Sequence, residues 1–135
     1  MAIETAIIAP VLVALSIGGF EVGSMVARQT ELQSAAAEAA AIVRASTPAT
    51  SEERLAIRNV VATSAKVRSW QVSVIEIYRC ADSTHYETSA DECDNGQVVN
   101  KFIRVSIWEY RRPIWAEFGI GSSVTFNVTR TVQVG

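Results

Sequence analysis

Residues 5–27 read TAIIAPVLVALSIGGFEVGSMVA, and this stretch decides what kind of protein the chain can be. It is long enough for a helix that crosses a bilayer, which needs about 20 apolar residues. Glu21 is the one charged residue inside it, with Glu4 just before it and Arg28 just after it. A secretory signal peptide fits badly, because no Lys or Arg precedes the apolar run and the run is too long. We expect a helix that lies in a membrane or in the core of a filament, and a simple membrane anchor remains an alternative.

The same helix is predicted to continue well beyond the apolar run. A one-sided stripe with steps of three and four residues indicates a helix packed along one face. Its members are Met25, Leu32, Ala36, Ala39 and Val43. Pro48 ends the pattern, so a helix from about residue 3 to residue 45 would be about 65 Å long at 1.5 Å per residue. The expected division is residues 1–48, a long helix with its hydrophobic half at 1–27, and residues 49–135, a head domain.

Several features of the hydrophobic half are candidates for subunit assembly. Gly19 and Gly23 form a GxxxG pair, which lets helices approach closely, although glycine is also common in membrane helices generally. Pro10 removes one helical hydrogen bond and can loosen or kink the helix. Glu21 at membrane depth would cost a few kcal/mol, so we expect it either to find a partner or to lie near the membrane surface.

The rest of the chain is predicted to form a small α+β head. Thr50 and Glu53 make a capping box that starts a second helix at about residues 51–66. The hydrophobic period then changes to two, which predicts strands at about residues 70–80, 99–110 and 124–134. One apolar and one polar face indicate a sheet with one solvated side. The expected fold is pilin-like: a long N-terminal hydrophobic helix and a short second helix packed on a small three-stranded antiparallel sheet. The positions expected to face the helices are Trp70, Val72, Val74, Ile103, Val105, Ile107, Val124, Phe126, Val128, Val132 and Val134.

Two cysteines, Cys80 and Cys93, enclose a polar and acidic loop. A disulfide closing a loop of this size stabilises a protein by about 3 kcal/mol in the chain-entropy model. We expect this disulfide if the head lies in an oxidising compartment; two free thiols of a cytosolic protein are the alternative. No CxxC motif or histidine cluster indicates a metal site, so neither a metal nor a cofactor is expected.

The sequence offers no catalytic constellation, and we expect a protein that is not an enzyme. It contains no nucleophile elbow, Walker A motif or HExxH motif. A net charge of −2 gives no reason to expect a nucleic-acid partner. The cluster of Asp91, Glu92, Asp94 and Asn95 could bind calcium, but it lacks the alternating ligand spacing of a known calcium loop, so a solvated loop is favoured. Trp108, Tyr110 and Trp115 could form an exposed contact patch, but we expect at least two of them in the core.

The order and spacing of the N-terminal motifs resemble the TadE-like family of pilin-like proteins of tight-adherence pilus systems. The motifs are AIETAIIAPVL at 2–12, GGFEVG at 18–23 and ARQTELQSAAAEAA at 27–40. The resemblance covers about the first 45 residues. The head agrees with the family only in its general order: strands, a Tyr-Arg-Arg-Pro segment at 110–113 and a last strand. It implies a subunit in the bacterial inner membrane before assembly, then in an extracellular pilus that serves cell adhesion. It also implies other copies of the chain, a prepilin peptidase and the pilus assembly machinery as partners.

The resemblance further gives Glu4 a role at the start of the helix. In such proteins a peptidase removes a short basic leader, and the chain from Met1 looks like the processed form. The family's glutamate is usually fifth after the cut, whereas Glu4 is fourth, so the cleavage point or the register differs. Glu4 could pair with the terminal amine of a neighbouring subunit and fix the axial offset between subunits. Alternatively, it lies among lipid headgroups and favours the helix N-terminus through the helix dipole.

Three hypotheses follow for the function. The first, which we take forward, is a structural subunit that polymerises through its N-terminal helix into a Tad or type IV-like pilus. The second is an accessory pseudopilin that stays in the inner membrane; major pilins of this system are usually much shorter, which favours it. The third is a monomeric membrane-anchored periplasmic binding module that uses the Cys loop. The first two predict that Glu4→Ala abolishes assembly, and the third predicts little effect.

Overall fold

A computed structural model describes the backbone of residues 2–94 and 96–135 and the side chains of residues 6–94 and 96–135. The chain starts with two helices, α1 (Ala2–Ser46) and α2 (Ser51–Ser64). Three strands follow: β1 (Val72–Cys80), β2 (Val99–Arg111) and β3 (Val124–Gln133). Short 3-10 helices lie in the connections: η1 (Ser69–Gln71), η2 (Ala90–Glu92) and η3 (Ile114–Phe118). The expected α+β fold, with one long and one short helix on a three-stranded antiparallel sheet, is confirmed.

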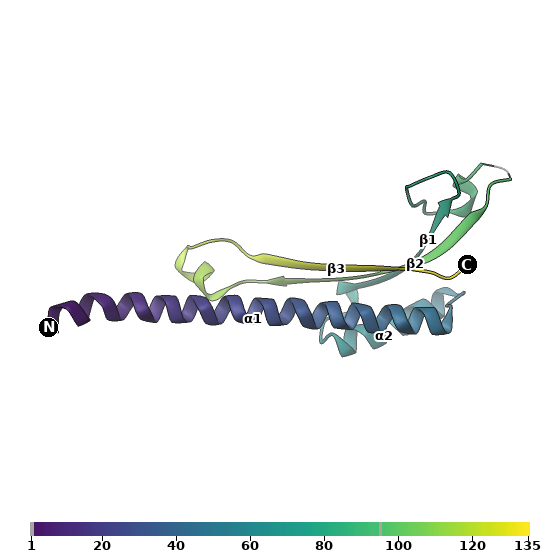
Figure 1. The fold of residues 1–135 in the computed structure, drawn as a ribbon. Helices are drawn as coiled ribbons and strands as arrows, with labels where there is room; N and C mark the ends of the chain where they lie inside the picture. The colour runs from purple at the N-terminus through teal and green to yellow at the C-terminus, as the bar shows by residue number, and fades with distance from the viewer. Residues whose placement is uncertain (1, 95) are drawn as a thin grey trace.

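Helix α1 runs along the whole molecule, and the head lies beside its C-terminal part (Figure 1). The N-terminal part projects from the head without support from the rest of the chain (Figure 1). The helix continues through Pro10, so one lost hydrogen bond does not end it. The predicted capping box starts α2: Thr50 Oγ1 accepts from the Glu53 N–H, and the Glu53 carboxylate accepts from the Thr50 N–H.

The sheet has the order β1-β2-β3, and both pairings are antiparallel. Its inner face packs on α1 beneath β2 and β3, and on α2 beneath β1. The predicted alternation therefore holds along β2 and β3. The most buried apolar side chains of this core are Leu32, Ala36, Ala39, Val43, Val61, Val72, Ile103, Val105, Ile107 and Val132.

The aromatic residues are placed differently from expectation. Trp70 was expected to face the core from the first strand, but it lies in η1, before β1 begins, and is exposed. Its ring packs edge-on against Trp108, with centroids 4.8 Å apart. Trp108 and Tyr110 are exposed as well, and Trp115 is half-buried, so the expectation that two of these three fill the core is wrong. The reason is parity: Ile107 faces the helices, so its neighbour Trp108 must face the opposite side.

A second, smaller apolar cluster lies on the opposite face of the sheet, at the far end from the N-terminus. Ile77 of β1 and Phe102 of β2 are buried there and are directly opposite each other in the register. Tyr86, from the loop between β1 and β2, packs edge-on against Phe102 with centroids 5.3 Å apart. This loop therefore acts as a cover for the outer face of the sheet rather than as a free connection.

Candidate assembly surface and its junction with the head

The N-terminal half of α1 exposes an apolar surface that nothing else in the chain covers. Every residue from 6 to 17 is exposed, as are the two residues that follow Gly18. The large apolar side chains here are at least half exposed: Ile7, Ile8, Val11, Leu12, Val13, Leu15, Ile17, Phe20, Val22 and Val26. Helix α1 is also long and apolar enough to cross a membrane. Burial of such surface is favourable by about 25 cal/mol per Å², so it requires lipid or other helices around it.

Gly19 and Gly23 lie on the side of α1 that faces away from the head. Both are exposed, and a Cβ built on either would meet no atom within 4 Å beyond its chain neighbours and the adjacent backbone of α1. Ala27, one more four-residue step along the helix, is exposed too and extends this row of small residues. A neighbouring helix could therefore approach α1 closely along this row without any change in the head. Of the other assembly candidates, Glu4 lies within α1, but its side chain is outside the described residues.

Glu21 is the buried acidic residue of the junction between helix and head, with only 3% of its surface exposed. It lies on the head-facing side of α1, in line with the half-buried residues Gly18 and Met25 and the fully buried Leu32. Among the side chains that the structure describes, no ion pair involves its carboxylate. Its burial thus comes from this chain's own head, and its role in subunit assembly stays a prediction.

The far end of the β2–β3 hairpin covers this part of α1. Arg111, the last residue of β2, donates from Nη2 to Ser24 Oγ at 3.3 Å. Ser24 in turn donates to the backbone carbonyl of Glu21 at 2.9 Å. The head therefore reaches back along α1 to about Gly18, nine residues beyond the expected boundary of the hydrophobic half at residue 27.

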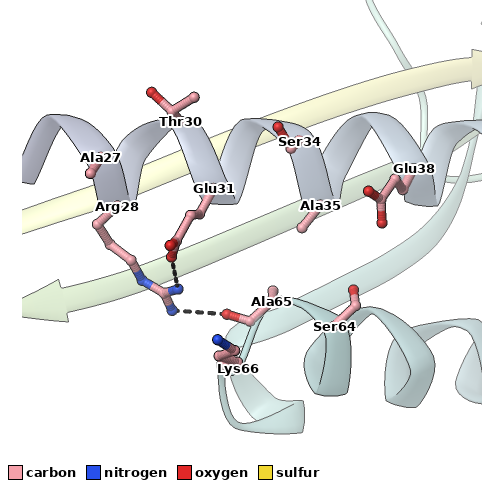
Figure 2. A pocket seen from close by; sticks show the side chains of 10 residues that line it. All are labelled: Ala27, Arg28, Thr30, Glu31, Ser34, Ala35, Glu38, Ser64, Ala65 and Lys66. Carbon is pink, nitrogen blue, oxygen red and sulfur yellow. Dashed lines mark hydrogen bonds and ion pairs between the residues drawn. The ribbon is translucent and has the colours of Figure 1, made fainter.

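Arg28 joins three elements at the centre of the junction. Its Nε donates to Glu109 of β2 at 2.7 Å, its Nη1 to Glu31 at 2.9 Å, and its Nη2 to the carbonyl of Ala65 at 2.9 Å. Figure 2 shows the guanidinium between α1 and the C-terminal end of α2, where it reaches Glu31 and Ala65. With 13% of the Arg28 side chain exposed, these charge-assisted bonds lie in a partly desolvated site. The three bonds hold the head at one angle on the helix.

A groove of about 570 Å³ opens beside this contact, between α1 and the end of α2 (Figure 2). Glu31 and Glu38 line it from α1, and Lys66 lines it from the turn after α2. The last carbonyls of α2 lie on the same side, so the groove combines acidic side chains with the negative end of a helix dipole. Arg28 and Lys66 line the same groove, so charges of both signs face it, and Arg28 already binds Glu31 and the Ala65 carbonyl.

A second charged cluster lies where the inner face of the sheet extends past the apolar core. The Glu76 carboxylate contacts Arg54 Nη1 and Lys101 Nζ, both at 2.8 Å, and accepts from the Tyr78 hydroxyl. Burial opposes ionisation of Glu76, but the hydrogen bonds from Lys101 and Tyr78 and the attraction of the cations outweigh it. The pKa of Glu76 is therefore lowered.

The lowered pKa of Glu76 predicts an acid-sensitive contribution to head stability. The stabilisation is complete above the ordinary pKa of a glutamate and is lost as the pH falls through the lowered folded-state pKa. Glu76→Gln should reduce the free energy of unfolding by about 1–2 kcal/mol at pH 7, and by less at pH 3. The measurement is denaturant unfolding of the full chain in detergent, followed by tryptophan fluorescence. Asp94→Asn, a change at an exposed carboxylate, is the control, and an equal loss at both pH values would contradict the prediction.

The Cys loop is closed by the expected disulfide between Cys80 and Cys93, whose Cα atoms are 5.6 Å apart. Within the loop, the Glu92 carboxylate accepts from Thr88 Oγ1 and the Ser89 N–H, so it caps η2. Asn95, which belongs to the acidic run considered for calcium, lies outside the described residues. Among the side chains of residues 6–94 and 96–135, no three His, Cys, Asp or Glu come together as a metal site would require.

A groove of about 870 Å³ follows the free edge of β1, between this strand and α2. Arg54, Arg58 and Trp70 are among its lining residues. The Arg58 Nε is buried and has no hydrogen-bond partner among the described residues. An edge strand with unpaired backbone groups can accept another strand, so this side of the head is open for contacts with other molecules.

Three residues of the junction were not singled out from the sequence: Arg28, Glu109 and Arg111. A signal was nevertheless available for two of them. Glu109 and Arg111 continue the inward positions of Ile103, Val105 and Ile107 along β2. A charged residue at an inward position must find a partner on the element beneath it, and α1 supplies Arg28 and Ser24.

The structure thus has an apolar helix half that the head leaves uncovered and a small α+β head with a disulfide, an arrangement that fits a protein anchored by its N-terminal helix. The family model for TadE-like proteins matches residues 1–41, which confirms the resemblance over somewhat less than a third of the chain. No curated protein and no solved structure matches the chain. The family match and the apolar helix agree with a pilus-related protein anchored by its N-terminal helix.

Proposed function

We propose that the chain is a structural pilin-like subunit that polymerises through α1 into a surface filament of the tight-adherence or type IV-like kind. The observation that carries this proposal is the bare half of α1: residues 6–17 are apolar apart from Ser16, form helix and are covered by no part of the head. A lipid bilayer would cover this surface before assembly, and the same surfaces of neighbouring copies would cover it afterwards. The row of Gly19, Gly23 and Ala27 gives such copies a place for close contact.

The implied path to the filament adds two kinds of partner. A prepilin peptidase would cut the leader at the inner membrane and free the terminal amine of the mature chain. The assembly machinery would then lift the subunit out of the bilayer into the fibre. Glu4 would pair with the terminal amine of an adjacent subunit, since a carboxylate in an apolar surrounding is costly without an opposite charge.

Electron microscopy of sheared surface fibres, with mass spectrometry of their subunit, tests the proposal. Fibres built from this chain would support the structural role. Its presence only in membranes and at low copy number would overturn that role and support an accessory pseudopilin. A folded, fully membrane-bound protein in cells whose fibres do not depend on it would support the membrane-anchored binding module.

Glu4→Ala is expected to abolish fibres while the head keeps its stability. The physical reason is that the proposed pairing partner lies on another subunit, whereas residues 6–17, which separate Glu4 from the head along α1, are all exposed. The measurements are the fibre yield after shearing and the unfolding midpoint of the membrane-bound protein. Glu38→Ala, which removes an exposed carboxylate from the C-terminal half of the same helix, serves as the control and should leave fibres intact. Normal fibres from the Glu4→Ala strain would contradict the pairing.

A further inference from the structure

The loop between β2 and β3, residues 112–123, has an apolar surface at one particular height along α1. It extends from the end of β2 that contacts Ser24, and it lies above the N-terminal half of the helix (Figure 1). Ile114, Phe118 and Ile120 are 50%, 77% and 66% exposed. Gly119 ends η3 with a φ of 74°, and this left-handed turn leaves Phe118 and Ile120 both on the outside of the loop.

At this same position along the helix axis ends the part of α1 in which every described residue is exposed. Residues 2–17 precede the first head-facing position, Gly18, and would span about 24 Å as a helix at 1.5 Å per residue. The hydrocarbon core of a bilayer is about 30 Å thick, so this segment alone falls slightly short of crossing it. A helix shorter than the bilayer draws its flanking residues to the membrane surface. Here the flanking part of the molecule includes the β2–β3 loop.

The charges around the loop fit the same boundary. Glu21 is the first charged residue after the apolar segment, and the head buries it, so its carboxylate is shielded from lipid at this height. Arg112, the first residue of the loop, is exposed, and its Nε lies 3.3 Å from the Glu117 carboxylate. Exposed apolar side chains with charged groups next to them are the pattern of segments that rest in the headgroup region of a membrane.

We propose that, before assembly, the β2–β3 loop is a membrane-surface contact: Ile114, Phe118 and Ile120 insert into the headgroup boundary of the bilayer that α1 crosses. The proposal rests on the membrane-anchored stage of the proposed function but not on polymerisation. The partner is a lipid surface because the apolar side chains of the loop lie beside the point on α1 where the lipid-facing segment ends. The contact fixes the angle of the head relative to the membrane. The Cys loop lies at the end of the molecule opposite the N-terminus (Figure 1), and so faces away from the membrane.

The test is the depth of a nitroxide label in nanodiscs that carry one copy of the full chain each. The two native cysteines are joined to each other, so a single added cysteine takes the label under non-reducing conditions. We expect the label of Phe118→Cys to lose access to a water-soluble nickel chelate and to gain access to oxygen. Leu12→Cys reports lipid at the helix, and Thr131→Cys reports water on the outer face of the sheet.

A second variant separates the loop from the anchor. With the label at position 118, Ile114→Ser and Ile120→Ser should return the label to water, and both sites are exposed enough for the head to stay folded. If the label at 118 is as accessible as that at 131 while Leu12→Cys is in lipid, the loop proposal fails and the anchor stands. If Leu12→Cys is itself in water, anchoring through α1 fails, and the loop proposal fails with it. Shielding that occurs only in discs with several copies would identify a second subunit as the occupant and would also overturn the proposal.

Discussion

Cells that carry Gly19→Leu together with Gly23→Leu are expected to make no surface fibres, although the subunit itself should fold. Both glycines are exposed, and in either case an added Cβ would meet no atom within 4 Å beyond its chain neighbours and the adjacent backbone of α1. Glycine is less favourable in a helix than alanine by about 0.8–1 kcal/mol per residue, and leucine ranks just below alanine, so α1 should become more stable. What the two leucines prevent is the close approach of another helix along the small-residue row.

The matched control is Gly19→Ala with Gly23→Ala, which also removes the glycines but keeps the row small. Fibres should form from this variant at near-normal yield. The measurements are fibre counts by electron microscopy, the amount of subunit in the membrane fraction, and the unfolding midpoint of the head. Normal fibres from the leucine variant would show that subunits do not pack through this face. Loss of the subunit from the membrane fraction would instead place the defect at insertion and contradict a role specific to assembly.

The arrangement of helices and strands could be predicted from the sequence because each element has a clear local signal. The expected helix at residues 3–45 differs from α1 by one residue at each end, and the capping box of Thr50 and Glu53 places the start of α2. The alternation of apolar and polar residues in β2 and β3 is also a local signal, and it identifies the positions that face the helices. Trp70 was misplaced because η1 intervenes between α2 and β1, and a single turn of 3-10 helix leaves no periodic trace in the sequence.

The extent of the head along α1 could not be predicted, because it depends on how strands and helix are oriented in space. A strand rises about 3.3 Å per residue and a helix about 1.5 Å, so the residues of β2 can run beside more than twice as many residues of α1. This is how Arg111 reaches Ser24 and how Glu21 becomes buried. Hydropathy alone marks Glu21 as an anomaly in an apolar run, and only the packing of the hairpin shows what covers it.

Removing the disulfide is expected to lower the free energy of unfolding of the head by about 3 kcal/mol, the chain-entropy value for a loop of this length. Cys80 is buried at the end of β1, and Cys93 follows η2. The loop is also held without the disulfide, because Tyr78 and Glu87 exchange backbone hydrogen bonds of 2.9 and 2.7 Å. Tyr86 adds its contact with Phe102. The reduced head should therefore stay folded with the same sheet, but unfold at a lower denaturant concentration.

Comparing oxidised with reduced wild-type protein isolates the stabilisation that comes from the crosslink. Reduction breaks the bond between Cys80 and Cys93 but leaves both sulfur atoms in place. Cys80→Ala with Cys93→Ala should lose slightly more stability, because it also removes a buried sulfur, and its unfolding midpoint should not respond to dithiothreitol. Unfolding in detergent with and without dithiothreitol makes the comparison for both proteins. If reduction leaves the wild-type midpoint unchanged, the stabilisation of the loop comes from Tyr86 and the Tyr78–Glu87 pairing, and the disulfide contributes little. A midpoint that falls with dithiothreitol only in the wild type would show that the crosslink stabilises the folded head, a contribution that is kept in an oxidising compartment.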